Sequence, residues 1–171
     1  IYAGRSGDPA YIYVSDDEGQ TWTPSAPLPQ AAGCEGWSFP WALLALPQHL
    51  GTLLAGVQHY CDPLPHPGNI YRSVDFGASW ESVNAHAYEA YSFMDFACDP
   101  MRPATIYAAN PSGEDGLLKS TDAGATWDSL GIEDVPAVEV EPGTHHVFIP
   151  NHSVCGRQES SLCRSTDGGM S

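Results

Sequence analysis

Four aspartates occupy the same position of a repeated motif, Ser-x-Asp-x-Gly-x-Thr/Ser-Trp. A row of carboxylates could serve general acid and base chemistry. The rest of the motif favours a structural role, because an Asp just before a Gly can accept hydrogen bonds from the N–H groups of a tight turn. The Gly allows the positive φ of such a turn. The residues of the four copies are Ser15, Asp17, Gly19 and Trp22; Ser73, Asp75, Gly77 and Trp80; Ser120, Asp122, Gly124 and Trp127; and Ser165, Asp167 and Gly169.

A second group of candidate residues lies in loop segments rich in aromatic and histidine side chains. Exposed aromatic rings in such loops could stack on sugar rings. For the aromatic segment 35–41 the alternative is packing between sheets, and for segment 86–91 it is a solvated loop. A metal ion bound by His59 and His66 would need a third ligand, and none is evident in the sequence. We therefore expect neither a metal nor a cofactor. The candidate binding residues are Trp37, His59, Tyr60, His66, Tyr88, Glu89 and Tyr91.

The elements that must position these residues repeat along the chain. The motif recurs every 45 to 60 residues or so, which matches one four-stranded propeller blade per copy. Each copy follows two short apolar segments, and three copies also have an earlier one. The expected first strands are 41–46, 93–98 and 137–140; the second are 1–4, 52–56, 105–109 and 145–149; the third are 10–14, 69–72, 116–119 and 161–164.

This pattern predicts an all-β fold: a β-propeller fragment of about four consecutive four-stranded antiparallel blades. The first and last blades would be incomplete. We expect the chain to be cut at both ends and to pack against remaining blades of the same protein, the alternative being that two chains close one ring. Segment 41–46 is almost continuously apolar, which predicts a strand buried on both faces. The predicted blades within the single domain 1–171 are 1–30, 37–84, 91–131 and 135–171.

Composition limits the partners and the location. The 171 residues include 21 Asp and Glu against 6 Lys and Arg, a net charge of −15, so nucleic-acid binding is not expected. The chain contains no apolar run of membrane-spanning length, and we expect no membrane insertion. The five cysteines could form two disulfides, Cys34–Cys61 and Cys155–Cys163, leaving Cys98 free. Disulfides would fit an extracellular, periplasmic or cell-surface location, whereas five reduced cysteines are the alternative.

The repeated motif resembles the Asp-box, or bacterial neuraminidase repeat. This repeat occurs in propellers of sialidases, xyloglucanase-type glycoside hydrolases, sortilin-type receptors and photosystem assembly factors. The resemblance covers essentially the whole chain. It implies that each box connects the third and fourth strands of a blade, on the side away from the usual ligand face. The motif aspartates would then be structural, and ligands would meet the opposite face, formed by the loops between second and third strands and by the connections between blades.

The resemblance leaves two functions open. A sialidase-like site needs three arginines, and the five in this chain are too few on the implied ligand face. A xyloglucanase-like site needs two aspartates on facing domains, and Asp95 is a single candidate acid. No complete catalytic set is present. The first hypothesis is therefore a secreted or cell-surface scaffold that binds a protein or carbohydrate ligand through its loop face. The alternative is part of a propeller glycoside hydrolase, and an intracellular assembly factor is a third class.

Overall fold

The computed structural model describes residues 1–171 except 32, 62–67, 84–92, 113–114, 151–161 and 170–171. The described residues form strands, turns and loops, and none forms a helix that could span a membrane. Two sheets have three strands: β1 (Tyr2–Arg5), β2 (Tyr11–Val14) and β3 (Thr23–Pro24), and β12 (Glu139–Val140), β13 (Val147–Pro150) and β14 (Leu162–Ser165). Two have four: β4 (Ser38–Ala45), β5 (Leu53–His59), β6 (Gly68–Ser73) and β7 (Glu81–Ser82), and β8 (Asp95–Cys98), β9 (Ile106–Ala109), β10 (Leu117–Ser120) and β11 (Asp128–Ser129).

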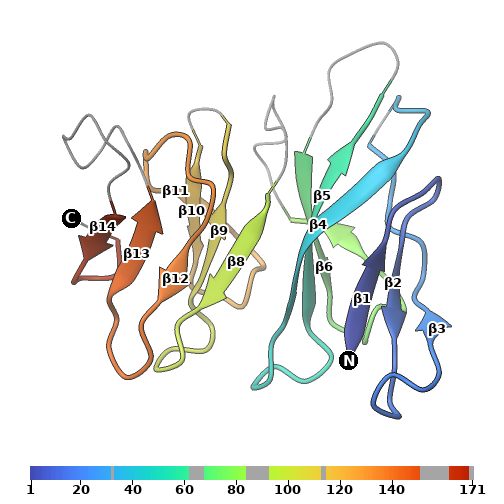
Figure 1. The fold of residues 1–171 in the computed structure, drawn as a ribbon, viewed down its shortest axis with the longest axis horizontal. Coiled ribbons are helices and arrows are strands. Elements are labelled where there is room, and N and C mark those ends of the chain that lie inside the picture. The colour runs from blue at the N-terminus through green and yellow to red at the C-terminus, as the bar shows by residue number, and fades with distance from the viewer. Residues whose placement is uncertain (32, 62–67, 84–92, 113–114, 151–161, 170–171) are drawn as a thin grey trace.

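Every strand pairs antiparallel with the strand that follows it in its own sheet, and the four sheets stand side by side in chain order (Figure 1). The edge strands at one side of the array are neighbours, since β1 contacts β4, β4 contacts β8 and β8 contacts β12. This is the arrangement of propeller blades around an axis. The prediction of four consecutive antiparallel blades, with the first and last incomplete, is confirmed. The residue limits given above for each blade stay predictions.

The repeated motif forms the hairpin between the third and fourth strands. In the third copy, the Ser120 hydroxyl donates to Asp122 Oδ1 at 2.8 Å and accepts the Gly124 N–H at 2.9 Å. Asp122 also accepts the N–H of Thr126 at 2.9 Å and its hydroxyl at 2.6 Å. The first two copies have the same four hydrogen bonds, and the described part of the fourth has the first two. Each box therefore closes its turn with its own side chains.

Two successive residues of each box have positive φ. The glycine was expected to, and Gly19, Gly77 and Gly124 have φ of 89°, 87° and 80°. The preceding residue was not expected to, yet φ at that position is about 60° in the first three boxes, where it is Glu18, Phe76 and Ala123. The fourth box has Gly168 there, with φ of 72°. Left-handed backbone costs free energy for residues with a Cβ, so the box hydrogen bonds must offset this cost three times.

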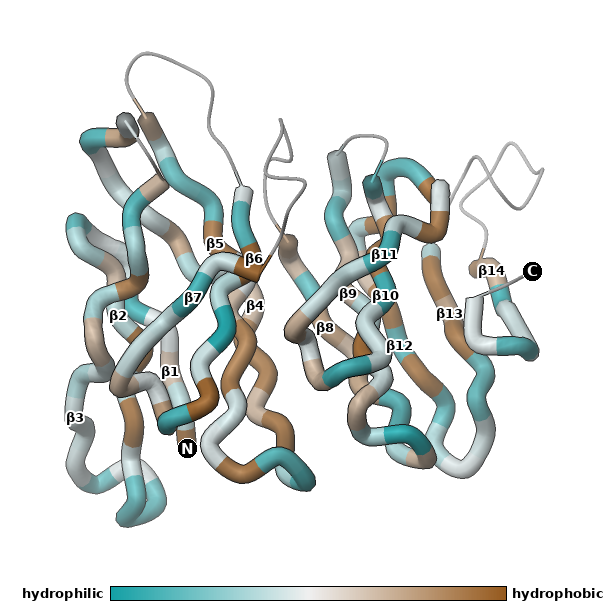
Figure 2. Tube along the Cα trace, turned by 180° about the vertical axis from the view of Figure 1, so that it is seen from behind, coloured by the Kyte–Doolittle hydropathy of each residue, from teal (hydrophilic) through white to brown (hydrophobic). Residues whose placement is uncertain are grey.

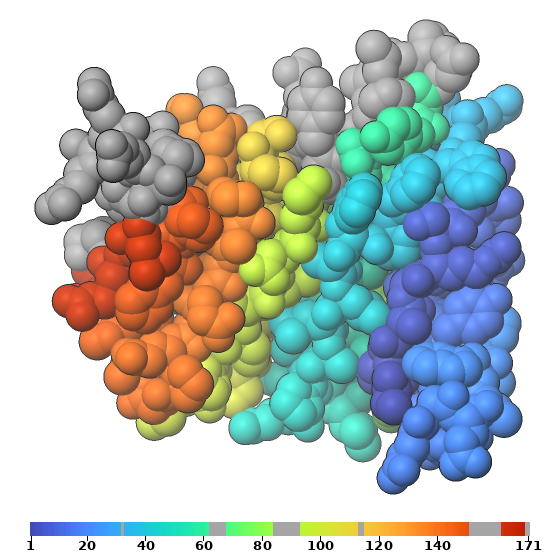
Figure 3. Space-filling view, in the orientation of Figure 1, coloured from blue at the N-terminus to red at the C-terminus, as the bar shows by residue number. Residues whose placement is uncertain are grey.

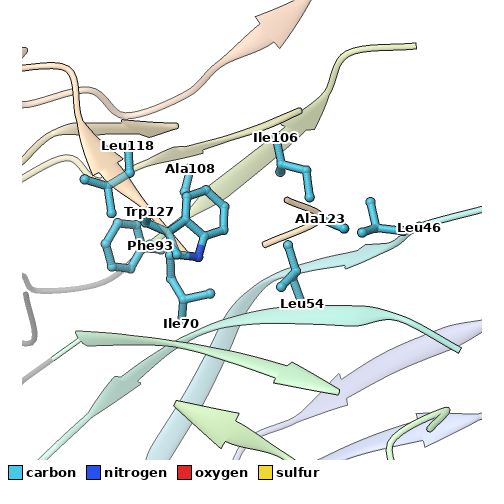
Figure 4. Close-up of a cluster of buried hydrophobic side chains, with 9 residues drawn as sticks. All are labelled: Leu46, Leu54, Ile70, Phe93, Ile106, Ala108, Leu118, Ala123 and Trp127. Carbon is cyan, nitrogen blue, oxygen red and sulfur yellow. The ribbon is translucent and has the colours of Figure 1, made fainter. Parts of the chain in front are cut away.

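Hydrophobic clusters fill the spaces between sheets. Figure 4 shows one of them, in which Leu54 and Ile70 of the second sheet face Ile106 and Leu118 of the third. Similar clusters join the first sheet to the second and the third to the fourth. The hydropathy colouring agrees, with hydrophobic positions mainly inside strands and hydrophilic ones at turns (Figure 2). Each sheet therefore buries apolar side chains against its neighbours, as the units of a repeat protein do.

The expectation that segment 41–46 is buried on both faces is wrong. Within β4, Trp41 and Ala45 are exposed, whereas all seven residues of β5 are buried. The reason is position. β5 lies inside its sheet with a neighbouring sheet on each face, while β4 is an edge strand whose outer side is not covered by another sheet (Figure 3, cyan). An apolar run in this chain therefore indicates a strand without telling which strand is the most buried.

Candidate functional site

The box hairpins lie at one end of the array, and the ends of β5 and β9, from which the chain leads toward the third strands, lie at the other (Figure 1). The box carboxylates are occupied by hydrogen bonds within their own turns. Hydrogen bonds, above all from the Thr21 and Ser79 hydroxyls, lower the pKa of Asp17 and Asp75 to about 2. Burial raises the pKa of Asp122, but hydrogen bonds from Thr126 and Ser120 outweigh it and the pKa is lowered. Ionised carboxylates saturated in this way support the structural role and leave the opposite end for function.

Asp95, the candidate catalytic acid, is held by the backbone. Its Oδ1 accepts the N–H of Phe96 at 2.9 Å, and its Oδ2 accepts the N–H of Val138 at 3.0 Å. Val138 belongs to the segment that leads into the fourth sheet, so the carboxylate joins two blades. Both oxygens are engaged, which favours a packing role for Asp95 over proton transfer to a ligand.

An aromatic cluster stands at the loop end of the second sheet. Trp37 directly precedes β4, Phe39 and Trp41 lie in its first half, and Tyr60 follows β5. The Phe39 ring centroid lies 6.4 Å from that of Trp37, 6.2 Å from that of Trp41 and 5.2 Å from that of Tyr60. Trp37 is 59% exposed, Trp41 53% and Tyr60 46%. We call these four residues the aromatic platform.

A β-bulge turns Trp41 out of the strand. Pro40 pairs with Val57 and Ala42 with Gly56, so Trp41 has no partner residue across the ladder. Bulges re-aim side chains, and they are common beside functional sites. The Trp41 indole N–H donates to the buried Gln58 Oε1 at 3.1 Å, which fixes the ring by its polar edge while the residue stays 53% exposed.

Several contacts join the two segments that carry the platform. Cys34 and Cys61 form a disulfide, the pairing expected from the sequence, with an S–S distance of 2.00 Å. The Tyr60 N–H donates to the Trp37 carbonyl at 2.8 Å. A Cβ on Gly36 would lie 2.1 Å from the Tyr60 carbonyl oxygen, so only glycine permits this close approach. These contacts together fix the relative position of the two segments that carry the rings.

The structure differs from expectation for His59. The side chain was a candidate for ligand binding, but it is fully buried. Its Nδ1 lies 2.8 Å from Ser38 Oγ and its Nε2 lies 2.9 Å from the Tyr71 hydroxyl. Burial lowers the pKa of His59 to about 4 and raises that of Tyr71 to about 12, so both are neutral at pH 7. His59 thus belongs to the interior, where it joins Ser38 to Tyr71.

His66, Tyr88, Glu89 and Tyr91 lie outside the described residues, as does Cys155, so these candidates and the Cys155–Cys163 pairing stay predictions. Among the described residues, no group of three His, Cys, Asp or Glu side chains is placed to hold a metal ion. Sequence reasoning singled out the aromatic segment 35–41, which contains Phe39 and Trp41, but named only Trp37 and Tyr60 as candidate binding residues. The alternate spacing 37, 39, 41 in a strand was the available signal, since such residues share one face.

Comparisons with known proteins agree with the blade architecture and with the repeated hairpin. A family model described as BNR/Asp-box repeat matches residues 13–24, the first box and its flanks. Its match falls on the hairpin whose side chains close the turn. The chain forms blades of an Asp-box β-propeller. A search of curated proteins finds no match to this propeller chain.

Solved propeller structures resemble the chain along almost its whole length. A GH74 enzyme of Niastella koreensis is 22% identical, with a TM-score of 0.58, over 99% of this chain and 22% of that one. A GH74 xyloglucanase of Xanthomonas campestris is 16% identical, with a TM-score of 0.63, over 100% and 31%. The Hadza microbial sialidase Hz136 is 19% identical, with a TM-score of 0.52, over 95% and 35%. The Asp-box propeller chain thus spans about a fifth to a third of these structures, and the likeness shows its fold.

Proposed function

We propose that the aromatic platform binds a neutral glycan, within a propeller of the glycoside-hydrolase type. The observation that carries the proposal is the cluster of three rings, each about half exposed, around the Phe39 ring. A disulfide and a β-bulge hold the segments that carry these rings in place. Sugars present C–H faces that pack on aromatic rings, while their hydroxyls need polar groups at the rim. The solved structures that the chain resembles include a xyloglucanase and a sialidase, which supports a carbohydrate ligand.

The charge of the chain favours a neutral ligand over an acidic one. A net charge of −15 repels anions. The surroundings of the platform add to this, because Gln30, which donates to the Gly36 carbonyl, also binds the Asp8 carboxylate, and Glu35 is exposed. Two of the few cations are committed elsewhere, since Arg72 and Lys119 donate to backbone carbonyls of neighbouring blades. We therefore propose a neutral polysaccharide rather than a sialylated or uronate-rich glycan.

Affinity electrophoresis against soluble polysaccharides tests this proposal. The chain should be retarded in gels that contain a neutral polysaccharide such as xyloglucan. It should migrate unchanged in gels that contain polygalacturonate or a sialylated glycoprotein. Trp22→Ala is a matched control, because this Trp is 38% exposed but belongs to a box hairpin at the opposite end. Retardation by the acidic glycans alone would refute the proposal. Loss of retardation in the neutral polysaccharide on changing Trp22 to alanine would refute it as well.

We further propose an extracellular or periplasmic location, which the Cys34–Cys61 disulfide supports. Protein produced in an oxidising compartment and denatured without reductant should expose a single thiol, Cys98, if Cys155 also pairs with Cys163. Three thiols would mean that only the Cys34–Cys61 bridge forms. Five thiols would contradict the proposed location and favour the intracellular assembly factor.

A further inference from the structure

The second blade exposes apolar side chains at the end of the array where the box hairpins lie. Leu50 is 84% exposed, Val74 56% and Phe76 50%. Leu50 belongs to the turn between β4 and β5, which lies at the same end as the boxes (Figure 1). Val74 and Phe76 occupy the second and fourth positions of the second box. We call these three residues the box-end patch.

The turn and the box meet at Gly51, which holds the patch together. The Gly51 carbonyl accepts the Phe76 N–H at 3.0 Å. A Cβ on Gly51 would lie 3.1 Å from the Phe76 ring and 3.1 Å from the Val74 carbonyl oxygen, and φ at this glycine is 85°. The turn itself is closed by the Leu46 N–H, which donates to the Thr52 carbonyl at 3.0 Å. The exposed side chains are therefore carried by one hydrogen-bonded unit.

The box hairpin does not require these apolar residues. All four boxes close with the same Ser and Asp hydrogen bonds, yet the other three have polar or small residues at the two positions in question. Those residues are Asp16 and Glu18 in the first box, Thr121 and Ala123 in the third, and Thr166 and Gly168 in the fourth. The apolar pair is thus a property of the second blade and not of the repeat.

Phe76 is also an unfavourable choice for the fold. Its φ of 61° is a left-handed conformation that bulky residues rarely adopt. Its ring is half exposed, so burial in the core does little to offset this cost. Gly168 has φ of 72° at the same position of the fourth box and meets no such cost. Strained residues that the fold does not need are concentrated at binding sites, and a contiguous exposed apolar patch points to the same role.

Carboxylates flank the patch and indicate the charge of its partner. The neighbouring boxes adjoin the second one, since the Ala26 N–H, beyond the first box, donates to the Gly77 carbonyl at 2.8 Å, and Arg72 Nε donates to the Ala123 carbonyl of the third box at 3.0 Å. Arg72 is also paired with Glu81, at 3.2 Å. The flanking carboxylates are Asp16 and Glu18 in the first box, Asp75 in the second and Asp122 in the third. A rim of this sign fits a cationic partner, and it disfavours both an anionic membrane and a second copy of a chain with a net charge of −15.

We propose that the box-end patch binds a cationic segment of a partner protein in which Lys or Arg residues flank apolar side chains. The apolar side chains of the segment cover Leu50, Val74 and Phe76, and its cations lie against the flanking carboxylates. The patch is at the opposite end of the array from the aromatic platform. The proposal is therefore independent of the glycan ligand.

Selection from a phage library of short random peptides tests the proposal, with the Phe76→Asn protein used to remove peptides that bind elsewhere. Asparagine tolerates the left-handed conformation, so this variant should not lower the Tm. The retained peptides should be cationic and should combine Lys or Arg with apolar residues. Synthetic copies should lose at least about tenfold in affinity for Phe76→Asn and for Leu50→Ser. Met101→Ser is the matched control, because Met101 is 59% exposed in the corresponding turn of the third blade.

The charge of the rim is tested by changing Asp16 to Asn and Glu18 to Gln together. This double variant should bind the same peptides about threefold or more weakly at low salt, and the difference should shrink as salt is added. The proposal is overturned if no retained peptide depends on Phe76, if the retained peptides are neutral or acidic, or if Met101→Ser causes an equal loss. Dimers in sedimentation velocity, or binding to phosphatidylcholine vesicles, would also overturn it if Phe76→Asn abolished them, because the occupant would then be a second copy or a membrane.

Discussion

Replacing Trp37 and Trp41 together by alanine is expected to lower the affinity for a neutral polysaccharide by at least about 100-fold. Each large aromatic side chain at the centre of a binding surface commonly contributes about 2 kcal/mol or more, and each 1.4 kcal/mol is a factor of ten. Isothermal titration calorimetry with a soluble oligosaccharide of the retained polysaccharide measures the change. Each single variant should lose part of this affinity, with the larger loss for Trp41, whose ring is oriented by Gln58.

The fold should survive this double change. Both side chains are more than half exposed, so little buried area is lost, and only the Trp41–Gln58 hydrogen bond is removed. Thermal unfolding of the double variant checks this, and Trp22→Ala again serves as the control for a tryptophan on the other end. An affinity within twofold of that of the unchanged protein would exclude the platform as the glycan site while leaving the propeller fold intact.

The second large effect is a loss of stability on acidification caused by His59. Its pKa is about 4 in the folded protein against 6.5 in the unfolded chain, so between these values the unfolded state binds a proton that the folded state excludes. The stability due to the neutral side chain is complete above pH 6.5 and falls as the pH decreases. The expected slope is about 1.4 kcal/mol for each pH unit through this window.

Urea denaturation at pH 7.5, 6, 5 and 4.5 measures this slope, and His59→Gln is the matched variant. Glutamine keeps hydrogen-bonding capacity toward Ser38 and Tyr71 but does not titrate. It should be less stable than the unchanged protein at pH 7.5 and should lose less stability by pH 4.5. The box carboxylates do not obscure the comparison, because Asp17 and Asp75, with pKa of about 2, lose their contribution only below about pH 4. If the free energy of unfolding changed with pH by the same amount in both proteins, the assignment of this pH dependence to His59 would be wrong.

Much of the fold follows from the sequence because the Asp-box is a local device. Ser120, Asp122, Gly124 and Thr126 satisfy one another within a single turn, so their spacing alone predicts the hairpin and, by repetition, the order of the strands. The Cys34–Cys61 pairing was also open to prediction, since both cysteines flank strands of one blade. The positive φ at Phe76 and Ala123 was not, because neither residue type favours it and the surrounding hydrogen bonds impose it.

The candidate site depends on contacts between segments that are distant in sequence. Whether Trp37 and Trp41 pack inside or face outward is decided by the bulge at Trp41 and by the open outer side of β4. Tyr60 joins them because β5 is antiparallel to β4 and brings residue 60 back beside residue 37. His59, next to Tyr60 in sequence, points the opposite way, since neighbouring residues of a strand face opposite sides of the sheet.

The sequence by itself determined the class of fold, the blade period and the strand order, and its resemblance to the Asp-box implied which end of the molecule the boxes occupy. These depend on interactions within about eight residues of one another and on a pattern repeated four times. Only the tertiary structure decided which apolar strand is buried, which aromatic rings meet at the surface, and that His59 is internal. These depend on which sheet face lies against a neighbour, and burial by a neighbouring blade is not encoded in any single segment.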